Sequence, residues 1–169
     1  GWILAVQSGI ILAKAAGPCS GRGSSLRAES AGMLAISLFV GLLFQYFHRT
    51  EVKVICISDN AELIKRQIEH LEYDIPYTNM SLKAEFDLTE QIYLSHKALN
   101  IQANFQHVKG HQDKNKKKKD LPLFAQLNIE ADQETGDYRL QFGKFLPVTP
   151  VLPSCQAVLS IQGLSVTNN

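Results

Sequence analysis

The stretch VKVICISDN, residues 52–60, decides how the chain around it is interpreted. Its β-branched and apolar run is typical of a strand buried inside a sheet. The run stops at a carboxylate, Asp59, which is followed by Asn60 and then by a helical pattern. In open α/β sheets, ligands bind beyond the carboxyl ends of the strands. The stretch therefore predicts a buried strand that presents Asp59 at a functional edge.

The composition indicates a folded domain in a reducing compartment. With 169 residues, 45% of them apolar and 20% charged, the chain can build a hydrophobic core and is not a disordered chain. Cys19, Cys56 and Cys155 are odd in number and widely spaced, without a CxxC motif, which argues against a disulfide framework or a zinc site. We expect an intracellular protein, cytoplasmic or nuclear.

Two strands and a long helix are expected before residue 52. Residues 1–16 have the pattern of two apolar strands joined by a turn at QSG, and no basic segment precedes them as it would in a signal peptide. Ser24 or Ser25 is expected to cap a helix that runs to about Phe47. The apolar block of this helix is shorter than the ~20 residues that cross a bilayer, so we expect a buried helix and no membrane partner.

Further elements follow the central strand. We expect helices at 61–71, 82–99 and 121–136, a loop at 73–80 and a strand at 101–110. The order β-β-α-β-α-α-β-α predicts an α/β fold, in which the first strands form an antiparallel ribbon and the later strands are joined by helical crossovers. The domain is expected to span residues 1–138, with an extended tail at 139–169.

Three carboxylates are distinguished by their positions. Glu29 lies in an otherwise apolar helix, Asp59 ends the central strand, and Asp132 lies in the last helix. Acids from a helix, a strand end and a second helix are suitable ligands for a hard cation such as Mg²⁺. Each acid also has an ordinary structural interpretation, as a helix-dipole partner, an N-cap or a solvated side chain.

Four motifs in order resemble those of type 1 ribonuclease H domains, most closely the domain found in retrotransposon reverse transcriptases. They are SSLRAE before the long helix, CISDN at the end of a strand, HVKGHQD after a later strand, and NIEADQ on the closing helix. The resemblance covers residues 1–138. It implies a ribonuclease H-like mixed sheet with helices on both faces.

The resemblance also implies roles for individual residues. Glu29 and Asp59 would hold one Mg²⁺ and Asp132 the other, with Mn²⁺ as a possible substitute, and all three would be catalytic. His111 matches a mobile catalytic histidine that assists proton transfer and product departure. Asn60 matches a residue that contacts the minor groove of the hybrid. The alternative for His111 is an exposed loop histidine.

The chain departs from the family pattern at its amino end. In the family, the first strand carries an Asp, typically in an Asp-Gly-Ser-like stretch, that bridges both metal ions. No Asp or Glu precedes Glu29 in this sequence, which begins at what resembles the second strand. We therefore expect an amino-terminally truncated or degenerate copy with impaired two-metal chemistry.

A lysine-rich run lies between two of the motifs. The segment KNKKKK at 114–119 contains five of the 17 basic residues. Lys116, Lys117, Lys118 and Lys119 are expected to contact phosphates of a nucleic-acid duplex, recognised through its shape and 2′-hydroxyls. The alternative is a solvated loop.

The resemblance leads to one main hypothesis and two competing ones. The main hypothesis is a ribonuclease H-like endonuclease domain of a retroelement polyprotein, whose intact form hydrolyses the RNA strand of RNA–DNA hybrids. Its partners would be the hybrid and the reverse transcriptase or other parts of the polyprotein. The first alternative is a degenerate, non-catalytic nucleic-acid-binding or connector domain. The second, a small-molecule site at Asp59, is disfavoured because the chain has no GxGxxG or P-loop sequence.

Overall fold

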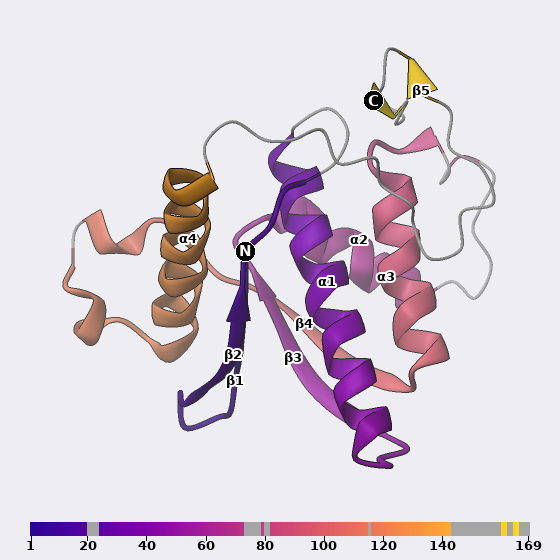
Figure 1. Ribbon diagram of the computed structural model, residues 1–169, viewed down its shortest axis with the longest axis horizontal. Helices are drawn as coiled ribbons and strands as arrows, with labels where there is room; N and C mark the ends of the chain where they lie inside the picture. Colours follow the sequence, from indigo (N-terminus) through magenta and orange to yellow (C-terminus); the bar gives the residue numbers. More distant parts are fainter. Residues whose placement is uncertain are drawn as a thin grey trace.

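The computed structural model describes residues 1–19, 24–72, 79, 82–114 and 116–142, together with the backbone of 160–161 and 164–165. The described residues combine helices with short sheets, so the predicted α/β class is confirmed (Figure 1). Most of the expected loop at 73–80 and most of the expected tail at 139–169 lie outside the described residues.

The amino-terminal strands form the predicted antiparallel ribbon. Strand β1 (Trp2–Ala5) pairs with β2 (Ile11–Ala15), and the register shifts near Ala5. Gly9 has a φ of 89° in the connecting turn, a conformation that glycine adopts without the steric penalty of a side chain.

Helix α1 (Ser25–Tyr46) begins where its capping serine predicts. Ser24 is the N-cap, and its hydroxyl accepts a hydrogen bond from the Arg27 N–H at 2.9 Å. By length and composition alone α1 could cross a membrane, a test that core helices of soluble proteins also pass. Its buried residues include Arg27, Ser30 and Ser37, and it packs against β1, β3, α2 and α3, as a core helix does.

Strands β3 (Val52–Ser58) and β4 (Ile101–His107) are parallel and in continuous register. Helices α2 (Ala61–Glu72) and α3 (Phe86–Ala98) form the crossover between them, as the sequence predicts. Helix α3 begins four residues later than expected, because Glu85 adopts a left-handed conformation with a φ of 57° and cannot continue a helix.

The last described helix is longer than predicted. Helix α4 (Leu123–Phe142) follows two short 3₁₀ turns and runs past Gly136, where the sequence suggested a stop. A side chain at Gly136 would meet no neighbouring atom, so this glycine stands on an open helix surface. Residues 139–142, assigned from sequence to the extended tail, are therefore helical. Strands β5 (Ser160–Ile161) and β6 (Leu164–Ser165) form a separate short hairpin.

The expected single mixed sheet is not what the described residues form. Among the residues that the structure describes, β1 pairs only with β2 and β3 only with β4, so these strands form two small sheets without a shared ladder. Helices α1, α2 and α3 group on one side of the strands and α4 on the other (Figure 1). Helices α1 and α4 each contact both β1 and β3 and so set how far apart the two sheets lie. The main core joins α1, α2, α3 and β4 through Met33, Leu63, Ile92 and Phe105.

Candidate functional site

The carboxyl end of β3 is fixed to the first turns of α1 by a serine. The Ser58 hydroxyl donates to the Glu29 carboxylate at 3.1 Å and accepts from the Asn60 N–H at 3.0 Å. Only 2% of Ser58 is exposed, so water does not compete for these bonds. The strand end thereby holds the Glu29 carboxylate in place.

Asp59 is enclosed by two further elements. The Asn128 side-chain amide of α4 donates to its carboxylate at 3.4 Å, and a His107 ring nitrogen lies 3.2 Å from its backbone carbonyl oxygen. A Cβ placed on Gly110 would lie 2.4 Å from Asp59 Oδ2 and 3.2 Å from its Cγ. The VKGH loop can therefore approach Asp59 this closely only with glycine at position 110.

The three predicted acids lie close enough to influence one another electrostatically. Burial raises the pKa of Glu29, and the charge of Asp59 raises it further, while the bond from Ser58 acts in the opposite direction. Desolvation and the charge of Asp59 also raise the pKa of Asp132, against a lowering effect of His111. Like charges thus lie together at the end of β3, and the charge of Asp59 disfavours the ionised forms of Glu29 and Asp132.

This arrangement fits a hard cation in its donors and charge. Glu29, Asp59 and Asp132 supply carboxylate oxygens, the ligands that Mg²⁺ prefers, and a cation would relieve their mutual repulsion. Within the described ranges, no three His, Cys, Asp or Glu side chains are grouped tightly enough to form a preformed metal cage. The three residues are of the type that binds Mg²⁺. In this structure, however, their carboxylates are not close enough together to coordinate one ion.

The other predicted site residues differ in their surroundings. His111 is exposed and has a φ of 53°, in the loop after β4. The Asn60 side-chain oxygen accepts from the Leu63 N–H at 3.1 Å, so Asn60 caps α2, which is its ordinary structural role. Contact of Asn60 with a nucleic acid stays a prediction.

The lysine run divides into two groups. Lys118 forms an ion pair with Glu130 of α4, which ties the loop to the last helix. Lys116, Lys117 and Lys119 are exposed, as either a phosphate-binding segment or a solvated loop would be. Phosphate contact by these side chains likewise stays a prediction.

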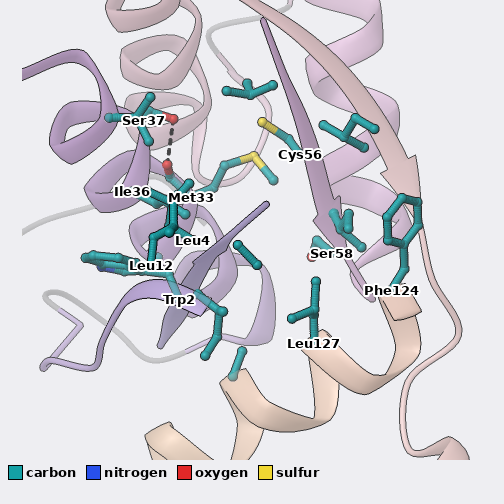
Figure 2. A pocket seen from close by; sticks show the side chains of 18 of the residues that line it. Trp2, Leu4, Leu12, Met33, Ile36, Ser37, Cys56, Ser58, Phe124 and Leu127 are labelled. Atoms are coloured by element: carbon teal, nitrogen blue, oxygen red, sulfur yellow. Dashed lines mark hydrogen bonds between the residues drawn. The ribbon is translucent and has the colours of Figure 1, made fainter. Parts of the chain in front are cut away.

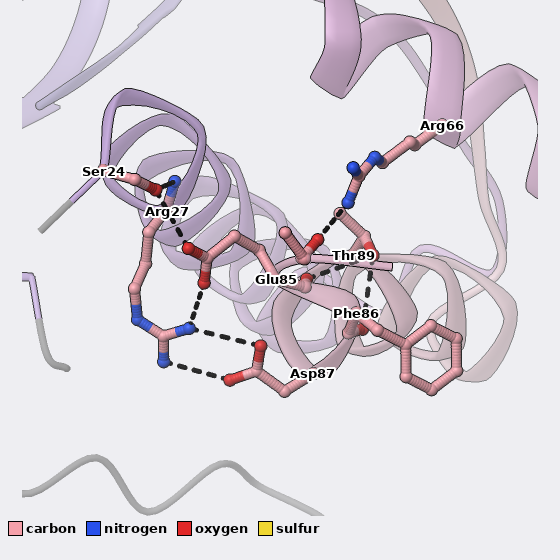
Figure 3. Close-up of polar contacts among 8 residues, drawn as sticks. Ser24, Arg27, Arg66, Glu85, Phe86, Asp87 and Thr89 are labelled. Carbon is pink, nitrogen blue, oxygen red and sulfur yellow. Dashed lines mark hydrogen bonds and ion pairs between the residues drawn. The ribbon is translucent and has the colours of Figure 1, made fainter. Parts of the chain in front are cut away.

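A buried ion network that the sequence did not reveal lies beside the site (Figure 3). The fully buried guanidinium of Arg27 contacts Glu85 at 2.5 Å and Asp87 at 3.0 Å, and Ser24 donates to Glu85 at 2.9 Å. Burial disfavours the charged guanidinium, but the bonds to Asp87 and Glu85 outweigh it and raise the pKa of Arg27. This network joins the first turn of α1 to the start of α3 and so positions the turn that carries Glu29.

Sequence patterns could not identify these supporting residues. Ser58 looks like a strand-end serine, Asn128 like an ordinary helix residue, and Arg27 like a solvated charge in the first turn of a helix. The only available signal was their position inside the motifs SSLRAE, CISDN and NIEADQ. No family model matches the chain, and no match was found among curated proteins or solved structures.

Proposed function

We propose that this chain is a ribonuclease H-like domain, of the kind found in retroelement polyproteins, that acts on the RNA strand of RNA–DNA hybrids. The observation that carries the proposal is the proximity of Glu29 of α1, Asp59 directly after β3 and Asp132 of α4 at the carboxyl end of that strand. Strand β3 is less buried than the sequence predicted, because Lys53 and Ile55 are exposed. The order of the four sequence motifs supports the same function.

Glu29, Asp59 and Asp132 would hold the Mg²⁺ ions. Such ions supply an activated water and stabilise the leaving oxygen in phosphodiester hydrolysis. The chain itself orients the carboxylates: Ser58 restrains Glu29, while Asn128 and the close approach at Gly110 restrain Asp59. A carboxylate held in this way loses little conformational freedom when it binds an ion.

His111 is suited to a proton-transfer role at the rim of the site. It is exposed on the loop after β4, and its charge acts on Asp132. An imidazole can accept a proton on one ring nitrogen and donate one from the other, which is what proton transfer at the rim requires. Lys116, Lys117 and Lys119 would bind phosphates of the hybrid, with an affinity that falls as salt rises.

The experiment measures hydrolysis of a short labelled RNA–DNA hybrid in Mg²⁺. It compares this chain, a form extended at its amino end by an Asp-Gly-Ser-containing strand, and the extended form carrying Asp59→Asn. We expect the extended form to cleave the RNA strand, and D59N to lower the rate by about a hundredfold or more. Asp137→Asn, which changes an exposed acid on α4, serves as the matched control.

A clear negative result is available. If the extended, folded form neither binds Mg²⁺ nor cleaves the hybrid, the proposed activity is wrong. Cleavage that D59N leaves unchanged would assign the activity to a contaminant or to a different site.

A non-catalytic hybrid-binding domain is the second candidate, favoured by the absence of a tight metal-ligand group within the described ranges. It predicts binding that survives Glu29→Ala and Asp59→Ala and weakens steeply with salt. Titration of the hybrid at several salt concentrations tests it, because each phosphate contact contributes a slope of roughly 0.7 to 0.9 in log affinity against log salt.

A further inference from the structure

Helix α1 has an inner side and an outer side. On the inner side, Met33 and Ile36 line a cavity of about 730 Å³ between the two sheets, together with Trp2 and Leu4 of β1 (Figure 2). The outer side carries five exposed residues, here called the α1 stripe: Ala28, Ala35, Phe39, Leu42 and Tyr46.

The α1 stripe has the spacing of one helix face. Its members follow one another at intervals of seven, four, three and four residues, which places them along one side of a helix. Every exposed residue from Ala28 to Tyr46 belongs to the stripe, apart from Gln45. The stripe is therefore the surface that this part of α1 presents to solvent.

Large and small side chains are separated along the stripe. Alanines occupy its amino-terminal half, whereas Phe39, Leu42 and Tyr46 occupy its carboxyl-terminal half. Leu42 is 63% exposed and Tyr46 is 77% exposed, and the Phe47 ring packs edge-on against Tyr46 with 5.2 Å between the ring centroids. Large apolar side chains gathered on an exposed surface are typical of an interaction site.

The exposed area of the stripe suits a reversible contact. With ~150–250 Å² for each aromatic side chain, the exposed parts of Phe39, Leu42, Tyr46 and Phe47 provide roughly 450 Å² of apolar surface. A stable protein–protein interface buries ~800 Å² on each partner. An association through the stripe is therefore expected to have a dissociation constant in the micromolar range.

The stripe is complementary to itself when two copies lie antiparallel. If the pair is centred at Ser37, Tyr46 of one copy faces Ala28 of the other, and Phe39 faces Ala35. Each large side chain then lies over a small one, as the packing of knobs into holes requires. A parallel pair would instead place Tyr46 on Tyr46 and leave a gap between the alanines.

The distribution of charge also favours a second copy as the occupant. No Asp, Glu, Lys or Arg occurs at residues 30–48, so two copies can meet along the stripe without repulsion between like charges. A helix that lies on a membrane surface is rich in Lys and Arg beside its apolar face, and this stretch has none.

We propose that the α1 stripe is a homodimer interface, in which the α1 helices of two copies pack antiparallel about a two-fold axis near Ser37. Such an interface uses the same surface on both copies, which self-complementarity permits. Trp2 of β1, whose ring centroid lies 5.2 Å from that of Phe39, borders the contact. The stripe contains none of the candidate acids, so the proposal does not rest on the proposed nuclease activity.

Sedimentation equilibrium of the full chain, without Mg²⁺ or nucleic acid, measures the association across the micromolar range. We expect an equilibrium between monomer and dimer. Leu42→Glu should weaken it at least about tenfold, because this change places a carboxylate against the apolar surface of the other copy. Leu140→Glu is the matched control, at an 86% exposed position on α4, and should leave the equilibrium unchanged.

A second variant tests the packing of large side chains over small ones. Ala35→Phe adds apolar surface and would strengthen non-specific adhesion. In the antiparallel pair, however, the new ring would collide with Phe39 of the other copy, and we expect dimerisation to weaken about tenfold. Circular dichroism checks that each variant is folded. If L42E fails to fold, A35F decides the question.

Disulfide trapping tests the orientation of the two helices. Chains with Ala28→Cys should cross-link to chains with Tyr46→Cys under mild oxidation, because the two positions face each other in the antiparallel pair. Neither variant should cross-link to itself above the level of the wild-type chain, which has three cysteines of its own.

Four results would overturn the proposal. They are a chain that stays monomeric, a dimer that L140E weakens as much as L42E, a dimer that A35F strengthens, and cross-linking of the A28C variant to itself in place of the Y46C variant. Binding of a monomeric chain to phosphatidylglycerol vesicles, abolished by L42E, would instead assign the stripe to a membrane surface. A failure of hybrid cleavage leaves all of these measurements unchanged.

Discussion

Two groups of charges lie near the amino end of α1, and they are balanced in opposite ways. In the Arg27 network, one buried cation is matched by Glu85 and Asp87, and both ion pairs join opposite charges. A few residues farther along the helix, Glu29 lies with Asp59 and Asp132 among like charges, and its pKa is raised. The first group has the composition of a structural element. In the second, His111 compensates Asp132 only in part, and a bound cation would supply further positive charge.

The largest effect on stability is expected from removing Arg27, the cation of the Arg27 network. Arg27→Ala leaves Glu85 without its charge partner in a buried position, and breaking such a pair costs about 3–5 kcal/mol. Urea denaturation measures the loss in the free energy of unfolding. Arg139→Ala, at an exposed position on α4, is the control and should change stability by less than about 0.5 kcal/mol. If Arg27→Ala and Arg139→Ala lowered the free energy of unfolding equally, the ion pairs of Arg27 would not have the structural role assigned to them.

The next largest effect is expected from adding Mg²⁺, which would bind among Glu29, Asp59 and Asp132. Mg²⁺ at ten times its dissociation constant should stabilise the wild-type chain by about 1.4 kcal/mol, since it binds only the folded form. Asp59→Asn should abolish this stabilisation, while Asp137→Asn should retain it. Thermal unfolding with and without Mg²⁺ gives the answer. A Mg²⁺ effect that survives D59N would place the ion elsewhere.

A smaller effect is expected from moving Asp59 instead of neutralising it. In Gly110→Ala the new methyl group would meet the Asp59 carboxylate and push it from its present position. We expect Mg²⁺ affinity to fall about tenfold, as when a supporting group of a metal site is lost. Gly136→Ala is the matched control, because a Cβ there meets nothing. Calorimetric titration of both variants with Mg²⁺ distinguishes them, and equal affinities would show that the contact at Gly110 has no positional role.

The smallest effect is a pH-dependent gain from Glu29→Gln. The folded-state pKa of Glu29 lies above its ordinary value of 4.5, so the folded chain holds this proton more tightly than the unfolded chain. Stability is therefore lost as pH rises from 4.5 through the folded pKa, and E29Q avoids this loss. We expect E29Q to be more stable than wild type at neutral pH by no more than about 1 kcal/mol, and equally stable below pH 4.5.

Urea denaturation across this pH range measures the difference between the two proteins. Burial lowers the pKa of His96 to about 4, so both proteins lose stability as pH falls from 6.5 toward 4. This shared loss cancels when the two curves are subtracted. A constant difference at every pH would mean that the charge of Glu29 is not the cause.

Two of the candidate acids, Asp59 and Glu29, could be located from sequence because they lie at or near element boundaries, whereas Asp132, in the middle of α4, was distinguished only by the motif resemblance. Asp59 ends a β-branched run and Glu29 follows a capping serine, and both features are local. The start of α3 could not be foreseen, because Glu85 leaves helical geometry to reach Arg27, a partner 58 residues away. Ser58 and Asn128 were missed for the same reason, since their roles depend on contacts with other elements.

The sequence by itself determined the order of elements, the antiparallel ribbon and the parallel pair β3–β4, because periodicity, turns and caps act between near neighbours. Only the tertiary structure decided that the strand pairs β1–β2 and β3–β4 lie on two sides of a cavity, that Arg27 is buried and paired with Glu85, and that Gly110 lies against Asp59. These features depend on how the helices pack against both sheets. Packing brings together residues that are far apart in the sequence, and no local sequence pattern predicts which of them will meet.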